Sequence, residues 1–183
     1  MLEENYLLPL KNLPPLGQEF TTSETELFTS LISEFSLSCR LNGPIEVQLS
    51  LLPSPDGLLV RGKLTGQVLV PCRRCAEDSA HSLLWEFDRF ESYPDPDTKK
   101  PSDFTDDSRI ILDKKLNYIL DLRALLGEEF MLALPSDPLC KEDCRGLCPH
   151  CGTNLNEHTC NCQKETLDPR LAVFRSLKLQ PKS

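Results

Sequence analysis

The sequence lacks long apolar runs and an excess of basic residues, and each absence excludes a class of protein. No apolar run is long enough to cross a bilayer. The opening residues Met-Leu-Glu-Glu are acidic where a signal peptide has a basic region followed by an apolar core. We therefore expect a cytoplasmic protein without a membrane partner. The 183 residues include 20 Lys and Arg against 28 Asp and Glu, and the resulting net charge of −8 disfavours generic binding to nucleic acid or anionic membrane.

The common sequence signatures of enzymes are also missing. The chain contains no phosphate-binding loop, no HExxH zinc-protease motif and no serine elbow. We therefore expect a protein that is not an enzyme and takes no small-molecule substrate. What the chain does contain is nine cysteines. Since no export signal accompanies them, they favour metal binding in the reducing cytosol over a framework of disulfides.

Six of the nine cysteines lie in the segment 140–162. Within it, Cys148-Pro-His-Cys151-Gly152 has the form of a zinc knuckle, in which two nearby thiolates hold one ion and the glycine lets backbone N–H groups turn toward the sulfurs. Tetrahedral zinc needs four ligands, and the tight spacing of the last four cysteines closes such a loop at low entropic cost. We predict that one zinc ion is bound by Cys148, Cys151, Cys160 and Cys162. Alternatives that stay open are Cys140 or Cys144 in place of Cys160, and His150 or His158 as a ligand.

Two cysteine pairs are left once Cys39, which lies on an apolar face and is expected to be a small buried hydrophobe, is set aside. We predict a second zinc site that ties the sheet to the tail, with the ligands Cys72, Cys75, Cys140 and Cys144. The alternative for Cys72 and Cys75 is a redox pair, because the flanking arginines would lower a thiolate pKa. A thioredoxin-like pair, however, sits between a strand and a long helix, whereas the residues after Cys75 predict a turn and a strand.

Alternating apolar residues predict an antiparallel β-meander and an α+β fold class. The expected strands are 45–51, 60–70 and a third that begins at Leu83. Gly62 and Gly66 within the second strand indicate a bulge. Pro71 ends that strand, and the sequence CRRC that follows is expected to form a loop. Shorter strands are expected near Tyr6–Leu10 and at Ile110–Leu112.

A few helices are expected to pack on this sheet. The sequence Ser23-Glu24-Thr25-Glu26 has the form of a capping box and precedes apolar residues at helical spacing, so the first helix is predicted at about 24–35. Before it, the double proline at 14–15 predicts an extended connection up to residue 22. Asp121 is expected to cap a second helix, which ends at Pro135.

We expect two parts in the chain. Residues 1–135 form the α+β sheet domain, which carries an acidic mobile loop at about 93–108, where apolar periodicity is lost. Residues 136–183 form a zinc-binding tail. The tail is predicted to end in a short basic helix, because Asp168-Pro169 is a typical helix start and the residues after it carry four basic and no acidic side chains.

The motifs together resemble those of the YceD family. The resemblance covers Pro44 to Lys178 and rests on VPCRRCAE after a strand, a helix ending in LALP, the run LCKEDCRGLCPHCGTNLNEHTCNC, and DPRLAVFRSLK. Cys72, Arg74 and Cys75 match the CxRC loop of the family, although Ala76 stands where leucine is usual. Some members that resemble this chain only at this loop lack the distal cysteines, which implies that the distal zinc stabilises the tail.

This resemblance implies a non-catalytic factor for the accumulation, processing or stability of large-subunit (23S) ribosomal RNA. Its partner would be this RNA or a pre-ribosomal particle. The basic residues that would contact RNA are Arg73, Arg74, Arg170, Arg175 and Lys178. The acidity of the body also fits a second partner, a basic ribosomal protein held by the acidic segment 86–107. Two other functions stay open: a zinc-dependent module that binds only protein, and a thiol redox enzyme that uses Cys72 and Cys75.

Overall fold

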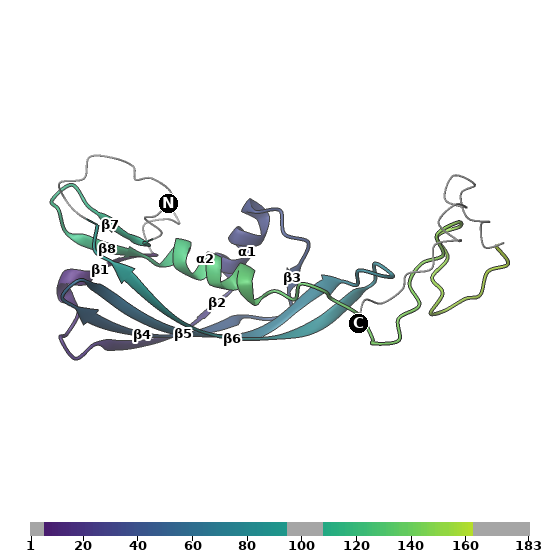
Figure 1. Cartoon of the computed structure of the whole chain (residues 1–183), viewed down its shortest axis with the longest axis horizontal. Coiled ribbons are helices and arrows are strands. Elements are labelled where there is room, and N and C mark those ends of the chain that lie inside the picture. Colours follow the sequence, from purple (N-terminus) through teal and green to yellow (C-terminus); the bar gives the residue numbers. More distant parts are fainter. Residues whose placement is uncertain (1–5, 95–107, 163–183) are drawn as a thin grey trace, which may run out of the picture.

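The computed structural model describes residues 6–94 and 108–162. Over these ranges the chain has the predicted α+β fold, with two α-helices and two antiparallel sheets (Figure 1). The elements are β1 (Leu7–Pro9), the 3₁₀ helix η2 (Leu10–Asn12), β2 (Gln18–Glu24), α1 (Glu26–Glu34), β3 (Arg40–Leu41), β4 (Ile45–Ser54), β5 (Gly57–Pro71), β6 (Asp78–Ser92), β7 (Ile110–Leu112), β8 (Tyr118–Asp121) and α2 (Leu122–Ala133). Most of the predicted acidic loop and the whole predicted C-terminal helix lie outside the described residues.

The larger sheet contains the predicted meander of β4, β5 and β6, with β2 and β3 added to it. The expected bulge at Gly62 and Gly66 is wrong, because β5 pairs with β4 and with β6 in unbroken register. These glycines serve close packing instead. A Cβ atom on Gly62 would lie 2.1 Å from the ring of Phe87, and one on Gly66 would lie 2.6 Å from the side chain of Ile45.

The start of the first helix also differs from the prediction. Residues 18–24 form β2, which pairs along its length with β4, so Ser23 and Glu24 belong to a strand. Thr25 is the N-cap of α1, and its side chain makes no capping hydrogen bond. The prediction of a capping box at Ser23–Glu26 is therefore wrong. The prediction of an irregular extended connection up to residue 22 is also wrong, because β2 begins at Gln18. Sequence periodicity gave no signal for β2 because most of its side chains are exposed, without clean alternation.

The core lies between the larger sheet and the two helices, which cover the same face of that sheet (Figure 1). The rings of Phe28 from α1 and Phe130 from α2 are fully buried, with centroids 4.9 Å apart. As predicted, Asp121 caps α2, since its carboxylate accepts a hydrogen bond from the Ala124 backbone N–H at 2.9 Å. The smaller sheet has the order β1-β8-β7 and leads directly into α2. No helix among the described residues is long and apolar enough to cross a membrane.

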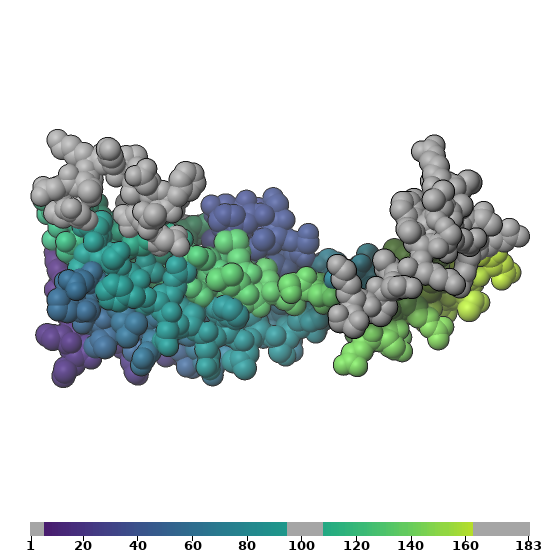
Figure 2. All heavy atoms as spheres, viewed as in Figure 1, coloured from purple at the N-terminus to yellow at the C-terminus, as the bar shows by residue number. Residues whose placement is uncertain are grey.

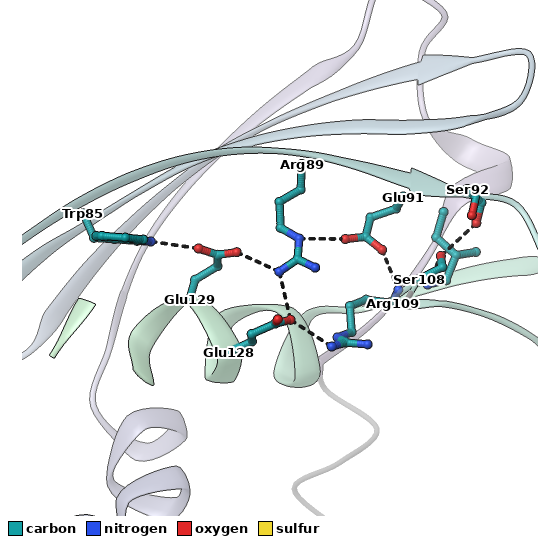
Figure 3. Close-up of polar contacts among 9 residues, drawn as sticks. Trp85, Arg89, Glu91, Ser92, Ser108, Arg109, Glu128 and Glu129 are labelled. Carbon is teal, nitrogen blue, oxygen red and sulfur yellow. Dashed lines mark hydrogen bonds and ion pairs between the residues drawn. The ribbon is translucent and has the colours of Figure 1, made fainter. Parts of the chain in front are cut away.

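A network of charged side chains joins β6 to α2 (Figure 3). The buried carboxylate of Glu129 accepts hydrogen bonds from the Trp85 indole at 2.8 Å and from Arg89 at 3.0 Å. Arg89 also forms an ion pair with the buried Glu91, 3.3 Å away. The second Glu91 oxygen accepts the backbone N–H of Arg109 at 2.6 Å. The network thus ties the end of β6 to the residues that follow position 107.

Replacing Arg89 by Met is expected to lower the free energy of unfolding by about 3 kcal/mol, because it leaves buried carboxylates without their counter-charge. We expect a value at the low end for buried pairs, since the Arg89 side chain is 20% exposed. Urea unfolding measures the change. Arg61→Met is the matched control on the neighbouring strand: Arg61 pairs with Asp88 at 2.9 Å, both side chains are 65% exposed, and its loss is expected to cost less than about 1 kcal/mol. Equal losses in the two variants would contradict a stabilising role for the network.

Candidate metal centres

The predicted CRRC loop forms the turn between β5 and β6, at the end of their long hairpin (Figure 1). Two backbone hydrogen bonds close the turn, from the Cys72 N–H to the Glu77 carbonyl and from the Ala76 N–H to the Cys72 carbonyl, each at 2.8 Å. Ala76 has a positive φ of 62°, which lets the chain reverse. Both cysteines of the turn are buried, with Cys72 2% and Cys75 3% exposed, and they pack with Leu139 and Cys144 of the tail.

The tail leaves α2 and docks on this turn. The Arg73 backbone N–H donates to the Pro138 carbonyl at 2.9 Å, and the Leu147 N–H donates to the Arg74 carbonyl at 3.0 Å. Gly146 has a φ of +75°, and a Cβ atom there would lie 2.9 Å from the Arg74 carbonyl oxygen, so the close contact requires glycine. Figure 2 shows the described part of the tail as a lobe at one end of an elongated body.

Docking brings four cysteines together, two from the turn and two from the tail, and we call this group the inner centre: Cys72, Cys75, Cys140 and Cys144. Their sulfurs all lie within 4.8 Å of one another. The Sγ atoms of Cys72 and Cys144 are 3.8 Å apart, and those of Cys75 and Cys140 are 3.6 Å apart. These distances are well beyond the S–S bond of a disulfide, about 2 Å. Four converging thiols at such spacing form a group that can hold one metal ion.

The remaining four cysteines of the tail form a second group, the outer centre: Cys148, Cys151, Cys160 and Cys162. Their sulfurs also lie within 4.8 Å of one another. The knuckle turn is closed by hydrogen bonds from the Cys148 N–H to the Thr153 carbonyl at 2.8 Å and from the Gly152 N–H to the Cys148 carbonyl at 2.9 Å. The outer centre is more open than the inner one, because only Cys148 of its four members is buried, whereas three of the inner four are buried.

The thiols within each centre differ in how readily they ionise. Burial opposes ionisation of Cys72, yet backbone N–H groups, that of Cys140 first among them, lower its pKa to about 6. Burial and the neighbouring sulfurs raise the pKa of Cys140 to about 12. In the outer centre the hydroxyl and backbone N–H of Thr153 lower the pKa of Cys151 to about 6, whereas the Cys151 sulfur raises the pKa of Cys162 to about 12. Adjacent thiolates repel, so a cation is needed to hold all four in the ionised form.

The structure also locates the other residues that the sequence singled out. Cys39 is 6% exposed and belongs to neither centre, in agreement with its predicted role as a buried hydrophobe. His150 and His158 are exposed and lie outside both groups. Arg73 pairs with Asp137 at 2.6 Å. Of the five basic residues predicted to contact RNA, three lie outside the described residues: Arg170, Arg175 and Lys178.

Sequence reasoning missed the role of Asn156 altogether, and it predicted Arg74 only as an RNA contact. The Arg74 guanidinium donates to the Cys144 carbonyl at 2.9 Å, so it supports the docked tail. The side-chain amide of Asn156 donates to the Cys144 sulfur at 3.3 Å and is the largest cause of the lowered pKa of that thiol. Asn156 stands in the motif NLN that marks the family resemblance, but a motif position does not reveal which distant sulfur the side chain meets.

Fold and site together define a small α+β protein with two four-cysteine groups that can each hold a metal ion. Its residues 60–178 match the family described as "Large ribosomal RNA subunit accumulation protein YceD". The chain belongs to the YceD family. The match includes the turn between β5 and β6, α2 and all eight cysteines of the two centres.

Several proteins are similar to this chain at modest identity. An uncharacterized protein of Mycobacterium tuberculosis is 27% identical over 128 residues, which cover 70% of this chain and 59% of that protein. A protein of Arabidopsis thaliana, named "Large ribosomal RNA subunit accumulation protein YCED homolog 1, chloroplastic", is 23% identical over 158 residues, or 75% of this chain and 49% of the relative. The homolog of the same name in Zea mays is 26% identical, and the alignment covers 72% of this chain and 54% of that protein. The chain thus spans about half to three fifths of these relatives. No solved structure matches it.

Proposed function

We propose that each centre binds one Zn²⁺ ion. With Zn–S bonds of about 2.3 Å, the sulfurs of a regular tetrahedron lie roughly 3.8 Å apart. The two short Sγ distances of the inner centre, 3.8 and 3.6 Å, agree with that value. Four thiolates around one zinc leave no open coordination position, and closed all-cysteine sites are structural. This supports two structural zinc sites and a protein that is not an enzyme.

Metal analysis of the purified protein is expected to give two zinc ions per chain. On addition of a chelator we expect release in two phases, with the outer ion leaving first, because only one of the four outer cysteines is buried. Alkylation followed by mass spectrometry identifies the phases, since Cys162 becomes reactive before Cys72. A fully folded protein without metal would contradict the proposal. Faster release from the inner centre would contradict the predicted order.

We propose further that the protein is a non-catalytic factor for the accumulation of large-subunit ribosomal RNA in the cytoplasm. The single observation that carries this proposal is the family match over residues 60–178, which includes both the docked turn and the tail. The plant relatives named for this role are similar to this chain at low identity. Structural zinc fits such a role because it fixes a protein surface for a partner rather than performing chemistry.

The direct partner is proposed to be the large-subunit RNA or a basic ribosomal protein of the same particle. A net charge of −8 disfavours long-range attraction to phosphate. Direct RNA contact would then use few phosphates, through Arg73 and the basic residues Arg170, Arg175 and Lys178. Few neutralised phosphates make the salt dependence of affinity shallow, with each contributing about −0.7 to −0.9 to the slope of log affinity against log salt. A basic protein partner would instead be held by the acidic segment 86–107.

The test measures the level of large-subunit RNA in cells without the protein and in the same cells complemented with a variant. The variants are compared at matched protein levels. Because the turn between β5 and β6 is the element shared most widely in the family resemblance, Cys72→Ser/Cys75→Ser is expected to lower this RNA relative to small-subunit RNA more than Cys160→Ser/Cys162→Ser does. Unchanged RNA in cells without the protein would contradict the proposed function. Equal or reversed defects in the two variants would contradict the ranking while leaving the function in place.

A further inference from the structure

Asn156 connects the two metal centres through a set of hydrogen bonds that uses its whole side-chain amide. Its Nδ2 donates one hydrogen to the Cys144 sulfur at 3.3 Å and the other to Asn154 Oδ1 at 2.9 Å. Its Oδ1 accepts the Arg145 backbone N–H at 2.9 Å. A reversed amide would turn its oxygen toward two acceptors, so these contacts fix the orientation of the group.

The position of Asn156 along the chain belongs to the outer centre. It lies in the loop between Cys151 and Cys160, two members of the outer centre. Hydrogen bonds within the tail give the loop its form, from the Leu155 N–H to the Gly146 carbonyl at 2.9 Å and from the His158 N–H to the Asn154 carbonyl at 3.0 Å. The sulfur that Asn156 contacts, however, is a member of the inner centre. Asn156 thus lies within the chain segment of the outer centre and forms a hydrogen bond with a member of the inner centre.

We propose that Asn156 is a positioning residue that couples the two centres: closing the outer centre places its amide against the Cys144 sulfur, and this strengthens metal binding at the inner centre. Hydrogen bonds to ligand atoms orient the ligands and tune the metal, and losing such a partner typically lowers metal affinity about 10- to 100-fold. The inference rests on the proposed metal binding and adds that the two sites fill cooperatively. Since the inner centre joins the tail to the sheet, filling of the outer ion then controls how firmly the tail is docked.

Thiol protection at buffered free zinc tests the coupling, because it reads each centre separately in the full-length protein. The protein is equilibrated over a series of free zinc concentrations and alkylated, and mass spectrometry follows Cys72 for the inner centre and Cys162 for the outer one. Asn156→Ala removes the amide. Asn156→Asp keeps an acceptor for the Arg145 N–H but removes the donor to sulfur. Glu157→Ala is the matched control, since this neighbouring side chain lies 4.0 Å from His158 and is exposed.

Both Asn156 variants are expected to raise the free zinc needed to protect Cys72 by about 10- to 100-fold. Because coupling between two sites is reciprocal, they should raise the midpoint for Cys162 as well, whereas Glu157→Ala should leave both midpoints unchanged. Cys160→Ser/Cys162→Ser is expected to raise the inner midpoint by a similar factor. In that background Asn156→Ala should add little, because the amide is no longer held in place.

Three results would overturn the inference. An unchanged inner midpoint in both Asn156 variants would mean that the contact has no effect. An equally large effect of Asn156→Ala with and without the outer ligands would mean that Asn156 acts on the inner centre alone. The third is an inner midpoint that does not respond to loss of the outer ligands. Failure of the proposed metal binding looks different, since no cysteine of the unsubstituted protein would then be protected at any zinc concentration.

Discussion

Cys72→Ser/Cys75→Ser is expected to lose one of two zinc ions and to free the tail from the sheet. Two cysteines of the inner centre come from the turn between β5 and β6 and two from the tail, so removal of the first two leaves only Cys140 and Cys144 of the proposed zinc site. Binding of a structural zinc is worth on the order of 10 kcal/mol in folding free energy. The few hydrogen bonds that remain between turn and tail, such as Leu147 N–H to Arg74 carbonyl, contribute roughly 1 kcal/mol each. We therefore expect protease cleavage between α2 and the outer centre.

Metal content and limited proteolysis check this expectation together. The variant should retain one zinc ion at the outer centre and keep the unfolding transition of the sheet domain. Cys39→Ser is the control, because it also changes a buried cysteine but one that belongs to neither centre. It should keep two ions and an uncut tail. A doubly substituted protein that still binds two ions, or whose tail resists cleavage as in the parent, would show that the four sulfurs do not share a metal.

Phe130→Ala is expected to lower the free energy of unfolding by about 3–5 kcal/mol, the usual cost of removing a buried aromatic ring. Phe130 has no exposed surface, and its ring packs on Phe28, which holds α1 and α2 together over the sheet. Denaturant unfolding measures the change. The adjacent Met131 is 37% exposed, so Met131→Ala should change stability by less than about 1 kcal/mol. A small loss at Phe130 would mean that the two helices collapse onto the space the ring leaves.

The parts of the fold that sequence predicted are those with local signals. Alternation of apolar residues marks β4, β5 and β6, and a turn of four residues with cysteines at its ends follows Pro71. Asp121 and Pro135 bracket α2 because capping and chain termination are decided within one helical turn. Cysteine spacing favoured the outer group, whose four members follow one another in the chain, and left the two remaining pairs as candidates for a second site. Spacing alone did not show that these two pairs meet, as they do in the structure.

The parts that sequence could not give depend on residues far apart in the chain. β2 is an edge strand, and only its pairing with β4 identifies it. The network of Arg89 with Glu129 joins positions 40 residues apart, and charge patterns carry no mark of burial. Glycine within a strand occurs both at bulges and at sites of close packing, so Gly62 alone could not distinguish the two. The ring of Phe87, which packs against Gly62, lies on the next strand and decides for close packing.

The inner centre joins positions that are distant in the chain, and a metal ion bound there closes a loop. Cys75 and Cys140 are 65 residues apart, and Cys72 and Cys144 are 72 apart. If a metal cross-link restricts the unfolded chain as a disulfide does, closing such a loop is worth about 4 kcal/mol in chain entropy. During synthesis Cys72 and Cys75 leave the ribosome well before Cys140 and Cys144. The first pair therefore has no partner cysteines until α2 and the tail have been synthesised. Completion of this centre is therefore a late event, and it marks a chain whose sheet and tail have both folded.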